Sequence, residues 1–404
     1  MTNESSQPAG SAFHLALIGA FPFPYPQGSQ IFARDQARAL QTCGARPEFF
    51  SYGRGQGQAP SDLEVHVAPA WSSPRNMRSG LHWSKPLADL ALGQVFAETA
   101  RKARAQGDGF DCVLAHNAEA ASLALALRPI TRVPVIYVVH TILRHELSAY
   151  LPEAIQAASN RTGQALDRWI AARCDGLIAL GPDAARELEP YTEAPLAVIP
   201  PGHFREPPPA DREISHVCHR HELTPRRYAL YSGNLDRYQD LSLLEEAAPF
   251  ITDPELPIVV ACHDSLAASR ANASGSPSLR YRFVEGFQEM RSLIHGAESL
   301  ILPRQRPGGF PIKLLNYMEA SRPIVAFEGI APTLVDGESA SLLARGASGQ
   351  DLARAVSRIR NHPELGVQLG DGARKALEQE HDWKSIGRKT CEHVAHSLAR
   401  KSRV

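Results

Sequence analysis

The stretch of chain from Leu302 to Ala326 has the order apolar run, glycine loop, helix start and second apolar run. This order predicts a strand–loop–helix–strand unit whose two strands are buried and parallel. Gly308 and Gly309 have no Cβ, so the backbone can approach a ligand closely, and free N–H groups at the helix start favour an anion. The loop therefore predicts a phosphate site, and its simplest ligand is a nucleoside diphosphate. Three cations surround this point: Arg304, Arg306 and Lys313.

Similar apolar runs alternate with helical patterns along most of the 404 residues. Because the runs are apolar on both faces, they predict buried strands in parallel, doubly wound α/β sheets. Two domains are expected, since a single core rarely exceeds ~250–300 residues. The predicted strands are residues 14–19, 112–115, 135–139, 176–180, 196–199, 228–233, 257–261, 280–284, 299–302 and 323–327.

A proline-rich, polar stretch over residues 201–227 interrupts the alternation and predicts the interdomain linker. We expect a disordered start over 1–11 and a first Rossmann-like domain over 12–200. A second Rossmann-like domain is expected over 228–382, followed by a terminal helix over 383–404 that packs back on the first domain. Ligands of such sheets bind at the carboxyl ends of the strands, so the cleft between the domains is the expected site.

The overall composition limits the function classes. Lys+Arg and Asp+Glu both number 43, so the net charge is zero and nucleic acid is not an expected partner. The 6 cysteines form no CxxC pair and are expected as buried thiols in a reducing compartment. Cys218–His221 is a lone cluster without a second ligand set, so no metal site is expected. A polar start and the lack of a ~20-residue apolar run predict a cytoplasmic protein.

Five segments, in their order and spacing, resemble the motifs of family-4 glycosyltransferases over most of residues 14–385. They are Pro26–Leu40, Asp111–Asn117, Asp175–Asp183, Val198–Gly202 and Leu302–Ala326. The resemblance implies the GT-B fold, in which two Rossmann-like, doubly wound parallel-sheet domains face each other across a cleft. It also implies transfer of a sugar from a nucleotide-diphospho-sugar with retention of the anomeric configuration, without a metal or other cofactor.

The sequence departs from the family pattern at four positions. The family's two donor-site glutamates correspond here to Gly308 and Asn316, and its diphosphate-binding Arg and Lys correspond to Asn234 and Gln239. One interpretation is a protein that has lost its activity. The other is a divergent donor site that still works.

We favour the divergent site, because other residues can replace the lost groups. Arg237, Arg304 and Lys313 offer cations for the diphosphate, and Asn316 can still hydrogen-bond a ribose hydroxyl. Glu319 lies one helical turn beyond Asn316 and is expected to be structural.

The predicted site residues fall into three groups. The catalytic group is His140, Arg304 and Lys313. The donor-binding group is Gly233, Asn234, Arg237, Gly308, Gly309, Phe310, Pro311, Ile312 and Asn316. The acceptor-side group is Gly28, Ser29, His116, Asn117 and Glu146. For the histidines and for Asn117 the alternative is a core or helix-capping role, and for Gly28 and Ser29 an ordinary strand–helix turn.

The resulting expectation is a hexosyltransferase-type enzyme that uses a UDP- or GDP-linked sugar. Its acceptor is unknown, with a cell-surface glycan or a lipid-linked intermediate as the family-level expectation. Docking at the inner face of a membrane through Phe21–Tyr25 is an alternative to a loop that is merely packed. A catalytically silent GT-B protein that binds a sugar nucleotide or a protein partner is the second hypothesis. A sugar-nucleotide epimerase ranks third, because paired carboxylates at strand ends are lacking.

Overall fold

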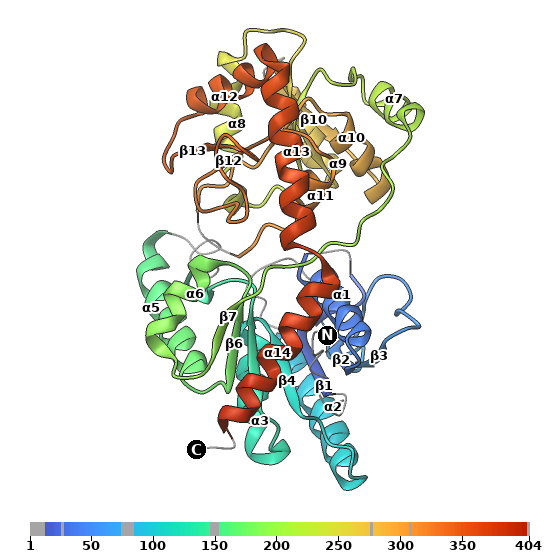
Figure 1. Ribbon diagram of the computed structural model, residues 1–404, viewed down its shortest axis with the longest axis vertical. Helices are drawn as coiled ribbons and strands as arrows, with labels where there is room; N and C mark the ends of the chain where they lie inside the picture. The colour runs from blue at the N-terminus through green and yellow to red at the C-terminus, as the bar shows by residue number, and fades with distance from the viewer. Residues whose placement is uncertain are drawn as a thin grey trace, which may run out of the picture.

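The computed structural model describes six ranges of the chain: residues 13–25, 28–73, 85–145, 153–274, 278–306 and 309–401. Within them the chain forms two parallel sheets with surrounding helices, stacked along the long axis of the molecule (Figure 1). The predicted α/β class and the two doubly wound sheets are thereby confirmed. The described helices include none that is long and apolar enough to cross a membrane.

The first sheet has seven described strands in the order β3-β2-β1-β4-β5-β6-β7. They are β1 (His14–Pro22), β2 (Arg46–Tyr52), β3 (Glu64–Val67), β4 (Cys112–His116), β5 (Val135–Val139), β6 (Gly176–Ala179) and β7 (Leu196–Val198). The helices of this part are α1 (Gly28–Thr42), α2 (Lys85–Ala105), α3 (Asn117–Thr131), α5 (Glu153–Ala171) and α6 (Pro182–Leu188).

The second sheet has six described strands in the order β10-β9-β8-β11-β12-β13. They are β8 (Ala229–Ser232), β9 (Ile258–Cys262), β10 (Leu279–Phe283), β11 (Ser299–Ile301), β12 (Ile324–Phe327) and β13 (Ser341–Leu343). The accompanying helices are α7 (Asp211–Arg220), α8 (Ser242–Ala247), α9 (Ser265–Ser274), α10 (Phe287–Gly296), α11 (Lys313–Glu319), α12 (Gly349–Asn361), α13 (Pro363–Glu380) and α14 (Trp383–Lys401).

Both faces of the first sheet are buried, which explains why its central strands are continuously apolar. Leu15 and Leu17 of β1 belong to one hydrophobic core, whereas Ala16 and Ile18 belong to a second core on the other face. Every residue of β4, β5 and β6 is buried as well. Alternate residues of a strand point to opposite faces, so a strand that is covered on both sides has no position that faces solvent.

The chain passes twice between the two sheets. The first crossing follows β7, and a parallel bridge pairs His203 of this segment with Asp382, which lies between α13 and α14 at the second crossing. Beyond it, α14 packs against α1 and β6 of the first domain, as the long red helix of Figure 1 shows. Residues 211–220 of the predicted linker form α7, which packs on α10, so this part of the linker is built into the second domain.

Glu319, at the end of α11, holds the first crossing segment in place. Its side chain is buried, with 7% exposed, and accepts the backbone N–H of Glu206 at 2.9 Å. His203 Nε2 and Arg291 Nε lie 3.2 and 3.4 Å from its carboxylate oxygens. Burial raises the pKa of Glu319, but the contacts with His203 and the Glu206 amide outweigh burial and lower that pKa to about 2.

Replacing Glu319 by alanine should therefore destabilise the protein by roughly 3 kcal/mol, because Arg291 would lose a buried partner. The carboxylate's contribution should be complete above about pH 4.5 and decline as the pH falls toward about 2, since the folded-state pKa is the lower one. Urea unfolding at pH 7 and pH 3.5 measures both effects. The matched control is Glu378→Ala, whose exposed ion pair with Arg205 should contribute less than about 1 kcal/mol. Equal losses in the two variants would contradict this role of Glu319.

Candidate functional site

Loops of the two domains meet beyond the carboxyl ends of β5 and β11. Gly309, in the loop after β11, lies so close to the first domain that a Cβ there would overlap the carbonyl oxygen of His140. A Cβ on Gly28, at the start of α1, would lie 3.3 Å from Ile312 Cγ1. The predicted glycine loop therefore contacts both His140 and the start of α1. Two cavities, of about 270 and 410 Å³, lie elsewhere, at the chain crossings and beside α12.

Lys313 reaches from the first residue of α11 to the carboxyl end of β8. Its Nζ donates to the Tyr231 hydroxyl at 2.8 Å and to Gln239 Oε1 at 3.3 Å. The space that it fills is available because Gly233 has no side chain, since a Cβ there would lie 2.6 Å from Lys313 Nζ. Burial, reinforced by the positive charge of Arg304, lowers the pKa of Lys313 to about 7.

Arg304, just after β11, is a second cation of the site and is buried, with 6% exposed. Its Nε donates to the Arg306 carbonyl oxygen at 2.9 Å, and its guanidinium carbon lies 5.7 Å from the centre of the Tyr238 ring. Burial lowers the pKa of Arg304 from its usual value, although an arginine stays charged in proteins. Within the described ranges, neither Arg304 nor Lys313 has a carboxylate oxygen within 4 Å. The charges of Asp240 and Asp236 act on Arg304 and Lys313, but neither cation forms a direct ion pair with these acids in the described residues.

Asn234, which stands where the family has arginine, is the centre of a short hydrogen-bond network. Its Nδ2 donates to Asp236 Oδ2 at 2.6 Å and to the Tyr238 hydroxyl at 3.0 Å. Its Oδ1 accepts from Gln239 Nε2 at 2.9 Å. Gln239 in turn contacts Lys313, so the loop after β8 holds the lysine in place. Tyr231, Asp236 and Tyr238 were not predicted from the sequence, because their roles depend on this folding of the loop.

His140 and His116 contact each other at the ends of β5 and β4. His140 Nε2 lies 3.0 Å from His116 Nδ1, and both rings are buried. The Phe32 ring meets the His140 ring edge-on, with centroids 4.9 Å apart. Burial lowers the pKa of His140 to about 3 and that of His116 well below its usual value. Both imidazoles are therefore neutral at physiological pH.

The other predicted site residues are distributed around this centre. Asn316 of α11 is half-buried, and Pro311 and Phe310 are buried in the glycine loop. Gly28 and Ser29 begin α1, and Asn117 begins α3 with a positive φ of 74°. Arg237 belongs to a 3₁₀ turn over Arg237–Gln239. Glu146 and Gly308 lie outside the described residues.

The loop Phe21–Tyr25 is not an exposed membrane anchor. Phe21 and Phe23 are 4% and 3% exposed, and the Phe23 ring lies 4.5 Å from that of Phe49. The alternative of a packed loop is the correct one, because both rings complete the core of the first domain.

Replacing Gly309 by alanine should weaken binding of a phosphate-bearing ligand at the glycine loop roughly 10- to 100-fold, because the new methyl group would displace the loop from His140. The matched control is Gly337→Ala. Gly337 also has a positive φ, 73° against 58° at Gly309, but a Cβ added there would have no other atom within 4 Å. Both variants should lose about 1–2 kcal/mol of stability to backbone strain. Calorimetric titration with a nucleoside diphosphate separates them, and equal affinities would show that the contact with His140 is dispensable.

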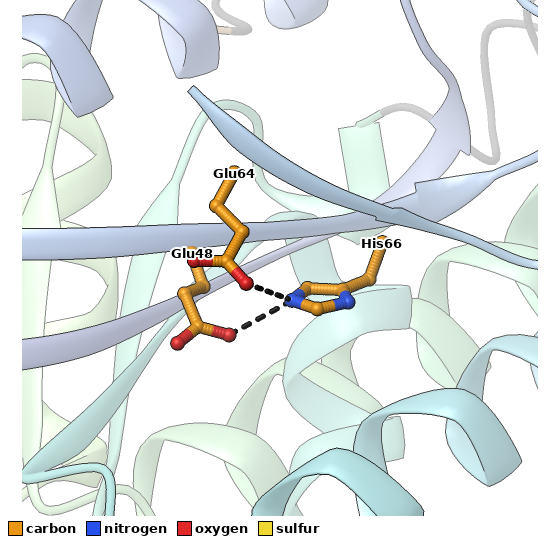
Figure 2. A group of neighbouring side chains, drawn as sticks. All are labelled: Glu48, Glu64 and His66. Atoms are coloured by element: carbon orange, nitrogen blue, oxygen red, sulfur yellow. Dashed lines mark hydrogen bonds and ion pairs between the residues drawn. The ribbon is translucent and has the colours of Figure 1, made fainter. Parts of the chain in front are cut away.

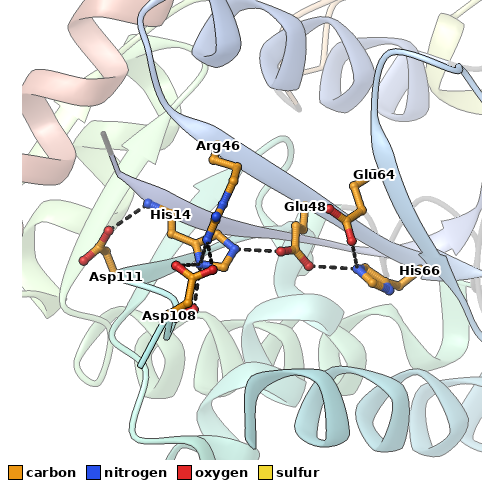
Figure 3. A network of polar contacts seen from close by, with 7 residues as sticks. All are labelled: His14, Arg46, Glu48, Glu64, His66, Asp108 and Asp111. Atoms are coloured by element: carbon orange, nitrogen blue, oxygen red, sulfur yellow. Dashed lines mark hydrogen bonds and ion pairs between the residues drawn. The ribbon is translucent and has the colours of Figure 1, made fainter. Parts of the chain in front are cut away.

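One group of side chains in the described ranges has the composition of a metal site. Figure 2 shows His66 Nε2 facing Glu48 Oε2 at 2.8 Å and Glu64 Oε1 at 3.6 Å. Glu48 Oε1 also contacts His14 Nε2 at 2.7 Å, so both its oxygens are already paired with histidines. Figure 3 shows this network continuing to Arg46, Asp108 and Asp111.

This network lies away from the candidate site. His14 is the first residue of β1 and Glu64 the first residue of β3, so both belong to the amino-terminal edge of the parallel sheet. Lys313 and His140 lie beyond carboxyl ends. We interpret the network as a structural link between β1, β2 and β3. Burial alone would raise the pKa of Glu48, but the contacts with the two histidines lower it, so they stabilise the charged carboxylate in the folded protein.

Comparisons with known proteins match both halves of the chain to glycosyltransferase families. Residues 26–203 match the family model described as Glycosyltransferase Family 4, and residues 226–362 match Glycosyl transferases group 1. A search of curated proteins found no significant match.

Solved structures with similar folds span nearly the whole chain. Sucrose-phosphate synthase from Thermosynechococcus elongatus has a TM-score of 0.73 at 16% identity and covers 96% of this chain and 100% of its own. Anabaena HepE in complex with UDP has a TM-score of 0.66 at 14% identity, covering 95% and 100%. WaaG, a glycosyltransferase involved in lipopolysaccharide biosynthesis, has a TM-score of 0.68 at 14% identity, covering 94% and 99%. With a family model matching each half and the GT-B fold throughout, the chain belongs to the family-4 glycosyltransferases.

Proposed function

We propose that this protein is an active glycosyltransferase that moves a sugar from a nucleotide-diphospho-sugar to an acceptor hydroxyl with retention of configuration. The observation that carries the proposal is that the buried Arg304 and the half-buried Lys313 lie near each other and lack a carboxylate within 4 Å in the described ranges. Burying unpaired cations is costly unless an anion accompanies them. A diphosphate next to the glycine loop supplies that anion.

In the proposed reaction, Arg304 and Lys313 stabilise the charge that develops on the leaving diphosphate. Asn316 replaces the family glutamate by hydrogen-bonding a ribose hydroxyl. His140, whose carbonyl oxygen contacts the loop at Gly309, completes the site from the first domain. The leaving phosphate accepts the proton of the acceptor hydroxyl on the same face of the sugar, which accounts for retention without a protein base. Contact between the domains excludes water and limits hydrolysis of the donor.

We further propose UDP as the nucleotide, with GDP as the alternative. The fold neighbour HepE has been solved with UDP and with UDP-glucose, which supports UDP. The involvement of WaaG in lipopolysaccharide biosynthesis supports a cell-surface glycan or lipid-linked acceptor. Such an acceptor would place the protein in the cytoplasm at the inner face of the membrane.

Thermal stability with UDP, GDP, ADP and their sugar conjugates tests the donor site. A ligand at 100 times its dissociation constant should stabilise the protein by about 2.7 kcal/mol. We expect a shift with one nucleotide and its loss in Arg304→Ala and Lys313→Ala. No shift with any nucleotide would contradict the donor site.

Turnover separates an enzyme from a silent binder, the alternative motivated by the four altered family positions. Release of the nucleotide from its sugar conjugate, first to water and then to glycan and glycolipid acceptors, should be measurable and should survive EDTA. The anomeric coupling constant of the product tests retention. Binding without any turnover would favour the silent GT-B protein.

A further inference from the structure

The histidine pair at the ends of β4 and β5 is held in one orientation. The two strands are neighbours in the sheet, with His116 paired in register with Val138, so both rings emerge at the same edge. Phe32 packs edge-on against both, at centroid distances of 4.9 Å to His140 and 5.9 Å to His116. The 3.0 Å approach of His116 Nδ1 to His140 Nε2 is therefore a fixed contact between buried rings.

A contact between two neutral imidazoles needs one ring to donate and the other to accept. Burial keeps both rings neutral, since the pKa of His140 falls to about 3 and that of His116 falls well below its usual value. Each ring therefore carries a single N–H. Either His116 donates from Nδ1, or His140 donates from Nε2.

The remaining nitrogen of His116 distinguishes these arrangements. His116 Nε2 is buried and has no hydrogen-bond partner among the residues that the structure describes. If His140 were the donor, the proton of His116 would sit on Nε2 as a buried, unpaired N–H. If His116 donates, Nε2 is left with only an unused lone pair. Unpaired buried N–H groups are rarer in proteins than under-used acceptors, so the second arrangement is favoured.

We propose that His116 is a positioning residue that holds His140 in its Nδ1–H form, so that His140 can donate a hydrogen bond from Nδ1 to an oxygen of the bound donor. The role of that hydrogen bond rests on the proposed function, whereas the protonation pattern belongs to the ligand-free protein. The backbone carbonyl of His140 contacts the glycine loop at Gly309, which places this residue beside the proposed donor site. His140 then acts as a hydrogen-bond donor and not as a base.

The pattern can be read from ¹H–¹⁵N long-range spectra of the ligand-free protein labelled on histidine, with His140→Gln to assign the signal. We expect His140 to be protonated on Nδ1. His116→Asn, whose amide N–H can occupy nearly the same position as Nδ1–H, should keep this form. His116→Phe, which retains a ring but no donor, should shift His140 toward Nε2–H. The buried His295 serves as an internal control whose signal should not change in either variant.

Protonation of His140 on Nε2 in the wild type would overturn the proposal, even if both variants failed to fold. An unchanged Nδ1–H form in folded His116→Phe would also overturn it. Sugar transfer provides a separate readout, in which His116→Phe should lower kcat roughly 10- to 100-fold with little change in the donor KM, and His116→Asn should restore most of it. A wild type with the Nδ1–H form but no transfer would count against the proposed function and leave the protonation assignment intact.

Discussion

Replacing Arg304 by methionine should make the ligand-free protein more stable and, at the same time, weaken donor binding. Arg304 is 6% exposed, and its Nε donates only to the Arg306 carbonyl oxygen among the described residues. Methionine has a similar length and no charge, so burying it avoids the desolvation cost. We expect a gain of about 1–3 kcal/mol in the free energy of unfolding. Loss of a charge-assisted contact to the diphosphate should weaken donor binding about 10- to 100-fold.

Urea unfolding without ligand and calorimetric titration with the sugar nucleotide measure the two effects on the wild type and the Arg304→Met protein. The control is Arg306→Met, which alters a side chain that is 68% exposed and lies 3.6 Å from Asp240. It should change unfolding by less than about 0.5 kcal/mol and binding only slightly. Arg304→Met with lower stability and unchanged binding would mean that Arg304 is a structural residue.

The affinity for the sugar nucleotide should fall as the pH rises above about 7, and Lys313→Arg should abolish this dependence. The pKa of Lys313 in the ligand-free protein is about 7, because the ammonium is buried next to Arg304. Above that pH the free protein holds a neutral lysine, and binding a diphosphate requires it to take up a proton. Affinity should then fall by up to about tenfold per pH unit until the pKa in the complex is reached.

A sugar nucleotide is the proper ligand for this titration, because the terminal phosphate of a free nucleoside diphosphate has its own pKa near 6. Arginine stays charged throughout, so the Lys313→Arg protein should show a flat profile between pH 6.5 and 9 even if its affinity is lower. His140 and His116 do not interfere, since their lowered pKa values keep them neutral over this range. A flat wild-type profile would show that the lysine does not change its charge on binding.

The lowered pKa of Lys313 also makes the free energy of unfolding depend on pH. The unfolded chain keeps Lys313 protonated up to about pH 10.5, whereas the folded protein releases that proton above about pH 7. The contribution of this group to the free energy of unfolding should therefore increase between these two pH values and be absent from Lys313→Met. Denaturation at pH 7 and 9 for both proteins measures it.

The apolar runs of the sequence were sufficient to predict the fold, because a strand that is buried on both faces is apolar along its whole length. All ten predicted strands correspond to strands of the structure. β2, β3 and β13 were missed. β3 and β13 are short and at the sheet edges, with no fully buried residue, and β2 begins with Arg-Pro-Glu, so none of them presents a clean apolar run.

The candidate site was predictable in its charges but not in its contacts. Arg304 and Lys313 stand out in the sequence because they flank a glycine loop. The partners of Lys313 do not, since Tyr231 and Gln239 lie 82 and 74 residues away in the chain. His116 and His140 were selected separately as strand-end residues. Their mutual hydrogen bond depends on the register of β4 against β5, which a single sequence does not define.

The packing of α14 on α1 has a consequence for the order in which this protein is made. The ribosome synthesises about 5–20 residues per second, so the last helix follows the first by roughly 20 to 70 s. During this interval the surface of α1 that α14 covers, including the close approach of Gly387 to the Ala39 backbone, has no partner. The first domain is thus synthesised first, but its packing is completed last. A premature stop before Trp383 would leave a nascent chain with two sheets and an uncovered apolar surface, a natural substrate for chaperones.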